Sequence, residues 1–118
     1  MIKIFGIKQC STMAKAFAWL DAQHLPYEFH DYKKLGIDAG TLAVWCADLG
    51  WEALVNTRGT TWRKLPEADR SNLDQARAIR LMVANPSLIK RPLILGGNEP
   101  LLGFDAARYA QVLGARNV

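Results

Sequence analysis

The chain has 118 residues, of which 50% are hydrophobic and 22% charged, and its formal net charge is +4 at pH 7. This composition is typical of a globular protein and excludes a disordered or low-complexity chain. The length suits one domain and is too short for two, so we predict a single domain over residues 1–118.

The same features exclude several other classes of protein. The N-terminal segment is not a signal peptide, because Lys3 interrupts its apolar run and Gly6 ends it. No apolar run approaches the ~18 residues of a membrane span. The basic residues are scattered rather than clustered with stacking aromatics, which argues against direct nucleic-acid binding. We therefore expect a cytoplasmic monomer with no membrane partner.

The first part of the chain has a βαβ pattern. We predict a strand over residues 1–5 and a helix over residues 11–23 that Pro26 stops. A second strand of about three to five residues should follow, indicated by Tyr27, Phe29 and Tyr32. The helix should bury one apolar face, formed by Ala14, Phe17, Ala18 and Leu20. The two strands should be parallel, with a right-handed crossover between them.

The middle of the chain is predicted to be helical. Asp38 can cap a helix through Leu49, with Gly50 after its end, and Leu42, Cys46 and Leu49 on one face. Residues 51–65 are rich in Gly, Thr, Asn and Trp, so we expect an ordered loop at residues 56–61. A short turn over 66–70, a helix over 74–84 and a further turn to Ile89 should follow.

The last part of the chain has a ββα pattern. Residues 91–95 and 101–104 are strand candidates, joined by a turn at 96–100. Asp105 can cap a final helix, followed by Gly114 and a polar tail. The residues of that helix expected to face the core are Ala106, Tyr109, Ala110 and Leu113. The element order predicts an α/β fold.

Cys10 is the main candidate for chemistry, because it lies between a predicted strand and the start of a predicted helix. The free N–H groups and positive end of a helix stabilise a thiolate, and Lys8 can add a positive charge. The alternative is that Cys10 is a small buried residue with no chemical role. With so few cysteine and histidine residues, a metal site is not expected.

Four segments together resemble the ArsC/Spx family, and most closely its YffB-type branch. They are Gly-Ile-Lys-x-Cys at 6–10, Asn-Thr-Arg-Gly-Thr-Thr-Trp-Arg at 56–63, Ile-Lys-Arg-Pro at 89–92 and Leu-Leu-Gly-Phe at 101–104. The resemblance covers about residues 2–113. It implies a thioredoxin-like fold with a mixed four-stranded sheet and a helical insertion.

The resemblance also implies roles for individual residues. Cys10 corresponds to the family's redox nucleophile, and Arg58 and Arg91 to arginines that line an anion site beside it. The fork of donors on an arginine suits a carboxylate or an oxyanion. The Arg91-Pro92 bond is expected to be cis, with Pro92 facing the cysteine. The alternatives are that Arg58 is a solvated loop residue, that Arg91 is a surface charge at a strand end, and that Pro92 is an ordinary proline at a strand start.

Two departures from the family pattern bear on function. Met13 replaces the second cysteine of a Cys-x-x-Cys pair, so the disulfide switch of Spx-type regulators cannot form there. Late in the chain, where arsenate reductases carry a further arginine, no basic residue occurs until Arg108. Cys46 could act as a resolving thiol, but its helical position favours the core. His24 and His30 are placed as ordinary polar residues.

These observations predict a glutathione-dependent thiol-disulfide reductase in which Cys10 is the catalytic residue. Lys8, Arg58, Arg91 and Pro92 would bind glutathione or an anion. No bound cofactor is expected: glutathione would be the co-substrate, the other substrate a small thiol or oxyanion, and glutaredoxin a possible partner. The alternatives are a non-enzymatic Spx-like protein that binds RNA polymerase, and an arsenate reductase.

Overall fold

The computed structural model describes residues 1–114, so the polar tail expected at 115–118 lies outside the described residues. The chain forms two compact units. One unit contains Met1–Asp31 together with the chain from Arg91 onward, and the other contains Tyr32–Lys90. Each unit is described by itself below.

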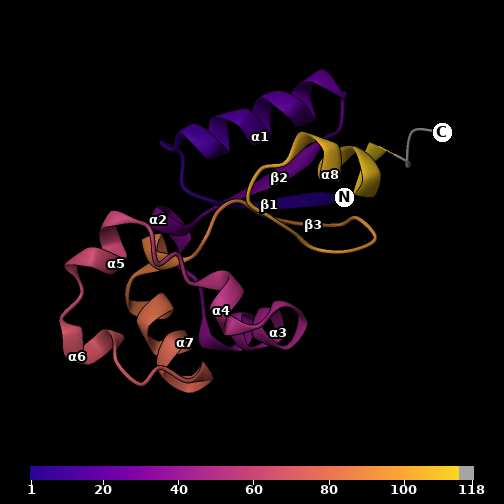
Figure 1. Ribbon diagram of the computed structural model, residues 1–118. Helices are drawn as coiled ribbons and strands as arrows, with labels where there is room; N and C mark the ends of the chain where they lie inside the picture. Colours follow the sequence, from indigo (N-terminus) through magenta and orange to yellow (C-terminus); the bar gives the residue numbers. More distant parts are fainter. Residues whose placement is uncertain (115–118) are drawn as a thin grey trace. The chain divides into compact units, whose positions relative to one another are not determined.

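The first unit is built on a mixed sheet of four strands, as expected (Figure 1). The strands are β1 (Ile2–Gly6), β2 (Tyr27–Asp31), β3 (Leu93–Leu95) and β4 (Leu101–Leu102). Their order in the sheet is β2-β1-β3-β4. β1 pairs with β2 in parallel and with β3 antiparallel, and β3 pairs with β4 antiparallel. The sequence therefore predicted both the βαβ start and the returning hairpin.

Two helices, α1 (Ser11–Ala22) and α8 (Ala106–Val112), form one core with the sheet. Ile2 and Ile4 of β1 and Ile94 of β3 belong to this core and are at most 2% exposed. Side chains alternate between the two faces of a strand, so both helices cover the same face of the sheet. The loop between β1 and α1, which contains Cys10, therefore connects two elements of the same core.

The buried faces of α1 and α8 match the prediction only in part: Leu20, Tyr109 and Leu113, the C-cap of α8, are buried as predicted. α1 buries Met13, Ala16 and Leu20, whereas Ala14 and Ala18 are exposed. In α8, Tyr109, Val112 and Leu113 are buried, while Ala106 and Ala110 are exposed. Alanine fits either face of a helix, and the larger side chains take the inward positions because they remove more apolar area from water.

The regular elements of the second unit are all helices within the described residues. Its helices are α2 (Tyr32–Leu35), α3 (Ala39–Leu49), α4 (Trp51–Leu54), α5 (Thr60–Lys64), α6 (Glu67–Arg70), α7 (Gln75–Ala84) and the 3₁₀ turn η1 (Pro86–Leu88). α3 and α7 pack together, and α4 packs against both of them. The helical insertion expected between the two halves of the sheet is confirmed.

Aspartate caps define three of the helix starts, and those at Asp38 and Asp105 were predicted. The carboxylate of Asp38 accepts the N–H of Thr41 at 2.7 Å, and that of Asp74 accepts the N–H of Arg77 at 2.8 Å. Asp105 caps α8 in the same way, at 3.2 Å. Gly50 ends α3 with a φ of 86°, a conformation that favours glycine.

Two local predictions in this unit were wrong. Tyr32 was assigned to the second strand, but the strand ends at Asp31 and Tyr32 begins α2. The ordered loop expected at 56–61 ends earlier than predicted, because the single-turn helix α5 begins at Thr60; the single-turn helix α4 before that loop was not predicted. Helices this short carry too few apolar repeats for a periodic pattern to reveal them.

Among residues 1–114, no helix has the length and apolar character needed to cross a membrane.

Candidate functional site

Cys10 lies at the junction of the sheet and α1, directly before the first helical residue. Its backbone is extended, and its carbonyl oxygen accepts the N–H of Ala14 at 3.0 Å, the first hydrogen bond of the helix. The side chain is partly buried and packs against the core of the first unit. The thiol therefore occupies the N-cap position, beside the unpaired N–H groups of the first helical turn.

The surroundings of Cys10 favour its thiolate form. Partial burial raises the pKa of the Cys10 thiol. Three groups lower it: the backbone N–H of Met13, the guanidinium of Arg91 and the backbone N–H of Thr12. Together they outweigh the effect of burial, so the pKa is below its ordinary value. A lowered pKa increases the fraction of nucleophilic thiolate near neutral pH. The expected effect of a helix start on this cysteine is therefore present in the structure.

Arg91 approaches Cys10 from the segment that leads into β3. It acts on the thiol both through a hydrogen bond and through its charge. The next residue, Pro92, is buried, and the Arg91-Pro92 peptide bond is cis, as the family resemblance implied. The carbonyl oxygen of Pro92 accepts the N–H of Gly103 at 2.9 Å, so this segment is held beside the residue that follows β4.

Lys8 is placed differently from Arg91. It lies in the loop between β1 and Cys10, and its side chain is exposed. The charged group that lowers the pKa of Cys10 is Arg91, and Lys8 is not among the contributing groups. Water weakens the Coulomb interaction of an exposed lysine, so closeness in sequence did not predict whether Lys8 lowers the pKa of Cys10.

Met13 fills the position where a second cysteine would complete a Cys-x-x-Cys pair. Its side chain is fully buried in the core. A Cβ atom added at Gly6 would lie 2.7 Å from the Cε atom of Met13 and 3.5 Å from the Cβ atom of Arg91. A side chain at position 6 would therefore displace Met13, whereas its contact with Arg91 would be ordinary. The side chain of Met13 packs in the core, and its backbone N–H stabilises the Cys10 thiolate.

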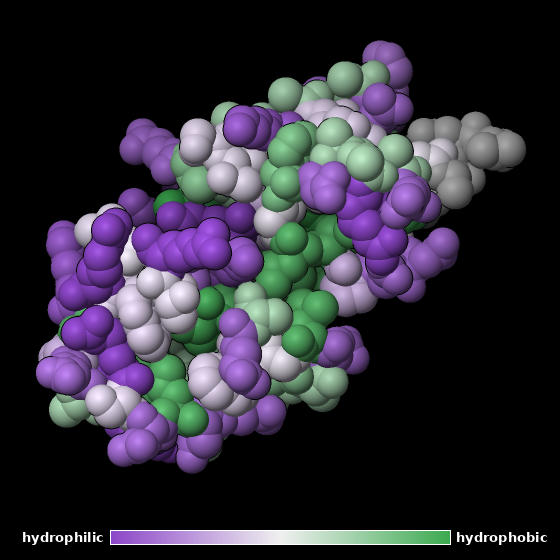
Figure 2. Space-filling view, viewed as in Figure 1, coloured by the Kyte–Doolittle hydropathy of each residue, from purple (hydrophilic) through white to green (hydrophobic). Residues whose placement is uncertain are grey.

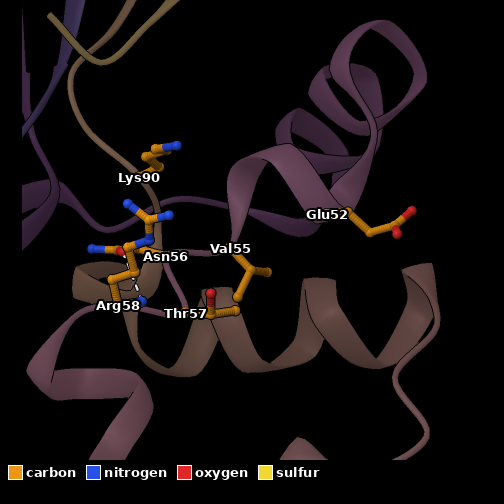
Figure 3. A pocket seen from close by; sticks show the side chains of 6 residues that line it. All are labelled: Glu52, Val55, Asn56, Thr57, Arg58 and Lys90. Carbon is orange, nitrogen blue, oxygen red and sulfur yellow. Dashed lines mark hydrogen bonds between the residues drawn. The ribbon is translucent and has the colours of Figure 1, made fainter.

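Arg58 belongs to the second unit and lines a cavity there (Figure 3). This cavity has a volume of about 350 Å³, and we call it the Arg58–Lys90 cavity. Its lining residues are Glu52, Val55, Asn56, Thr57, Arg58 and Lys90. Arg58 is exposed, and the association of Arg58 with Cys10 that the resemblance implied stays a prediction.

Lys90 and Asn56 were not singled out from the sequence as binding residues. They line the Arg58–Lys90 cavity because the segments around them pair: Val55 forms an isolated antiparallel bridge with Ile89. A signal was present, since both residues lie within the two segments that carry the family resemblance, beside Arg58 and Arg91. Only the pairing of those segments shows that Lys90 and Arg58 share a cavity.

The remaining candidates from the sequence are Cys46, His30 and His24. Cys46 is 4% exposed within α3, and burial raises the pKa of its thiol, which confirms its place in a core. The ring of His30 lies 5.1 Å from that of Phe5, centroid to centroid. His24 follows α1 with a φ of 56° and is exposed. None of these three side chains lines the Arg58–Lys90 cavity.

Comparison with known proteins places this architecture in a family. The family model described as the ArsC family matches residues 5–112. An uncharacterised protein of Haemophilus influenzae is 41% identical, over 92% of this chain and 96% of its own length. The global transcriptional regulator Spx of Streptococcus mutans is 28% identical, over 89% of this chain and 77% of its own length.

A solved structure, that of the YFFB protein, is similar throughout. It superimposes with a TM-score of 0.92 at 50% sequence identity, and the match covers 96% of this chain and 99% of that one. The resemblance seen in the four sequence segments is thus confirmed over nearly the whole chain. The chain belongs to the ArsC family and has the thioredoxin-like fold of that family.

Proposed function

We propose that this protein is a glutathione-dependent thiol-disulfide reductase with Cys10 as its nucleophile. The observation that carries the proposal is the environment of the Cys10 thiol, whose pKa is lowered by the start of α1 and by Arg91 after the opposing effect of partial burial. A cysteine that is partly accessible and electropositive in its surroundings is typical of reactive rather than structural thiols.

The reaction has two thiol-disulfide exchange steps. In the first, the Cys10 thiolate attacks the glutathione sulfur of a mixed disulfide between glutathione and a substrate thiol. A bond forms between Cys10 and glutathione, the substrate disulfide breaks, and the substrate leaves as a thiolate. In the second, the thiolate of another glutathione attacks the glutathione sulfur on Cys10, releasing oxidised glutathione and restoring the Cys10 thiolate.

An outside thiol is needed because the chain offers no suitable resolving cysteine. Position 13 is methionine, and the only other cysteine of the sequence is Cys46. Burial raises the pKa of Cys46, which disfavours the thiolate that an attack would require. Glutathione, which is abundant in reducing compartments, fits this need.

The first prediction concerns the reactivity of Cys10. Alkylation by iodoacetamide should proceed readily below about pH 8, because a lowered pKa keeps the thiolate populated there. Oxidised glutathione should add one glutathione to Cys10, seen as a mass increase of the intact protein and located by peptide mapping. Reduced glutathione should then remove it.

Cys46 provides an internal control for that experiment. Its buried thiol should stay unmodified in the folded protein and react only after denaturation. A Cys10 that alkylates no faster than a free model thiol across the pH range would contradict the proposal, as would glutathione addition at Cys46 alone.

A second candidate function is a regulator that acts by binding a protein partner, and the observation favouring it is the similarity to Spx. The missing Cys-x-x-Cys pair makes a redox-switched regulator the weaker of the two proposals. Affinity capture with purified RNA polymerase separates them. A docking protein should retain the polymerase equally as wild type and as Cys10→Ser, whereas the proposed reductase should not retain it.

A further inference from the structure

The Arg58–Lys90 cavity separates positive from negative charge. Figure 3 shows the Arg58 guanidinium directed toward Lys90, with the Asn56 amide near them, whereas Glu52 extends on the opposite side beyond Val55. All four polar side chains line the same cavity of about 350 Å³. That volume is within the range of sites for small organic ligands. The cavity therefore presents cations at one end and a carboxylate at the other.

Backbone hydrogen bonds join the two segments that carry the cations. The N–H of Asn56 donates to the carbonyl of Leu88 at 2.9 Å, and the N–H of Lys90 donates to the carbonyl of Leu54 at 2.7 Å. These bonds lie on either side of the bridge between residues 55 and 89. They join two segments that are distant in sequence, and so they keep the stem of Lys90 close to the segment that carries Arg58.

Asn56 is also oriented by local contacts. Its side-chain oxygen accepts the N–H of Arg58 at 3.1 Å, which leaves the amide N–H groups as donors. A Cβ atom at position 59 would lie 2.9 Å from the Nδ2 atom of Asn56, so a larger residue there would displace this amide. The cationic end of the cavity thus has a positioned neutral donor beside its two charges.

The charges in the cavity are available to a ligand. Within residues 1–114, neither Arg58 nor Lys90 forms an ion pair with a carboxylate, and Glu52 forms none with a cation. Two neighbouring cations repel each other, and a carboxylate placed between them is attracted to both, which offsets that repulsion. The guanidinium can bind a carboxylate with two parallel hydrogen bonds, and the ammonium can add a third.

We infer that the Arg58–Lys90 cavity binds a small peptide that carries both a carboxylate and an ammonium group, of the glutathione class. The carboxylate lies at Arg58 and Lys90, and the ammonium lies toward Glu52. Lys90 and Glu52 are the specificity-determining residues, because together they distinguish such a peptide from a simple anion. The choice of a thiol peptide rests on the proposed function, whereas the charge pattern does not.

Calorimetric titration of the full chain with S-methylglutathione tests this inference. The methyl group blocks the sulfur, so binding is measured without disulfide exchange at Cys10. Lys90→Gln should weaken the affinity by about tenfold, the effect expected from losing one charge-assisted hydrogen bond. The matched control is Lys64→Gln, an exposed lysine of α5 outside the cavity lining, which should bind as wild type does.

The role of Glu52 is tested with a second probe, N-acetyl-S-methylglutathione, which lacks the ammonium group. Wild type should bind this probe several-fold more weakly than S-methylglutathione. Glu52→Gln should bind the two probes with nearly equal affinity, because the carboxylate that favours the ammonium is gone. This difference between probes would not arise from a merely structural effect of the substitution.

Two results would overturn the inference. One is a Lys90→Gln variant that binds S-methylglutathione as tightly as wild type. The other is equal binding of both probes by wild type, with inorganic sulfate competing as well as the peptides do, which would indicate a simple anion site. Titration with S-methylglutathione reports the cavity without any reaction at Cys10, and iodoacetamide alkylation reports Cys10 without any ligand in the cavity, so failure of the Cys10 chemistry and failure of the cavity are distinguishable.

Discussion

At the scale of single residues, Arg91 is expected to control the reactivity of Cys10. Arg91→Gln removes the hydrogen bond and the charge that lower the pKa of the Cys10 thiol, so that pKa should rise. Less thiolate is then present at neutral pH, and alkylation at pH 7 should slow by roughly threefold to tenfold. The pH profile of iodoacetamide alkylation measures this change as a displacement of the curve toward higher pH.

Lys8→Gln is the matched control, because it removes a cation two residues from Cys10 in sequence. The exposed Lys8 is not among the groups that lower the pKa of Cys10, so its removal should leave the pH profile nearly unchanged. Equal displacement of the profile by both substitutions would show that general positive charge, rather than the contact with Arg91, sets the reactivity.

The sequence predicted the position of Cys10 but not all of its neighbours. A cysteine between a strand and a helix can be recognised from local patterns, because both elements have short-range signals. The place of Arg91 beside Cys10 was expected from the family resemblance and not from local patterns, because its segment lies far along the chain. The burial of Met13 was not predicted either, because the apolar face expected for its helix ran through Ala14, Phe17, Ala18 and Leu20.

At the scale of elements, helix starts were predicted better than helix faces. The predicted caps at Asp38 and Asp105 depend only on residues within one turn, and both are present. The faces of α1 and α8 depend on which residues meet the sheet. Where alanines occur on several faces, periodicity does not decide between them, and the larger Met13 and Val112 become buried instead.

The start of α7 illustrates a contact that local signals do not reveal. The guanidinium of Arg77 donates to the carbonyls of Ser71 at 2.8 Å, of Asn72 at 3.2 Å and of Ala68 at 3.1 Å. It therefore holds the end of α6 and the following turn against the start of α7. Arg77→Lys should reduce the free energy of unfolding by about 1–2 kcal/mol, since an ammonium cannot reproduce the planar fork.

Urea unfolding measures that loss, and amide hydrogen exchange locates it in residues 68–74. Arg80→Lys, on the exposed surface of the same helix, is the control and should leave stability within about 0.5 kcal/mol of wild type. If exchange in residues 68–74 stayed at the wild-type rate in Arg77→Lys, these three hydrogen bonds would not be holding the turn.

At the scale of the whole molecule, the sequence predicted the order of elements and the mixed sheet because each strand and long helix has its own pattern. The Arg58–Lys90 cavity could not be predicted, because its walls come from segments joined by backbone bonds between residues distant in sequence. Figure 2 shows hydrophilic side chains gathered over the region of α2 and α5 in the second unit. Hydropathy alone does not tell which of these side chains share a cavity.

The positive net charge of the whole chain should affect how fast anionic substrates react. Oxidised glutathione is negative at neutral pH, so a protein with a net charge of +4 attracts it over distances up to the screening length. That length falls from ~30 Å to ~3 Å as ionic strength rises from about 0.01 M to about 1 M. Over this range, the rate of mixed-disulfide formation at Cys10 should fall about threefold to tenfold, as followed by mass spectrometry.

The neutral compound 2-hydroxyethyl disulfide separates this attraction from a direct effect of salt on Cys10, because its rate should change little with ionic strength. The double variant Lys15→Glu/Lys64→Glu brings the formal net charge from +4 to zero at two exposed positions. It should show a smaller salt dependence with oxidised glutathione and an unaltered rate with the neutral disulfide. An unchanged salt dependence in this variant would mean that charges close to the reacting groups, and not the net charge, attract the substrate.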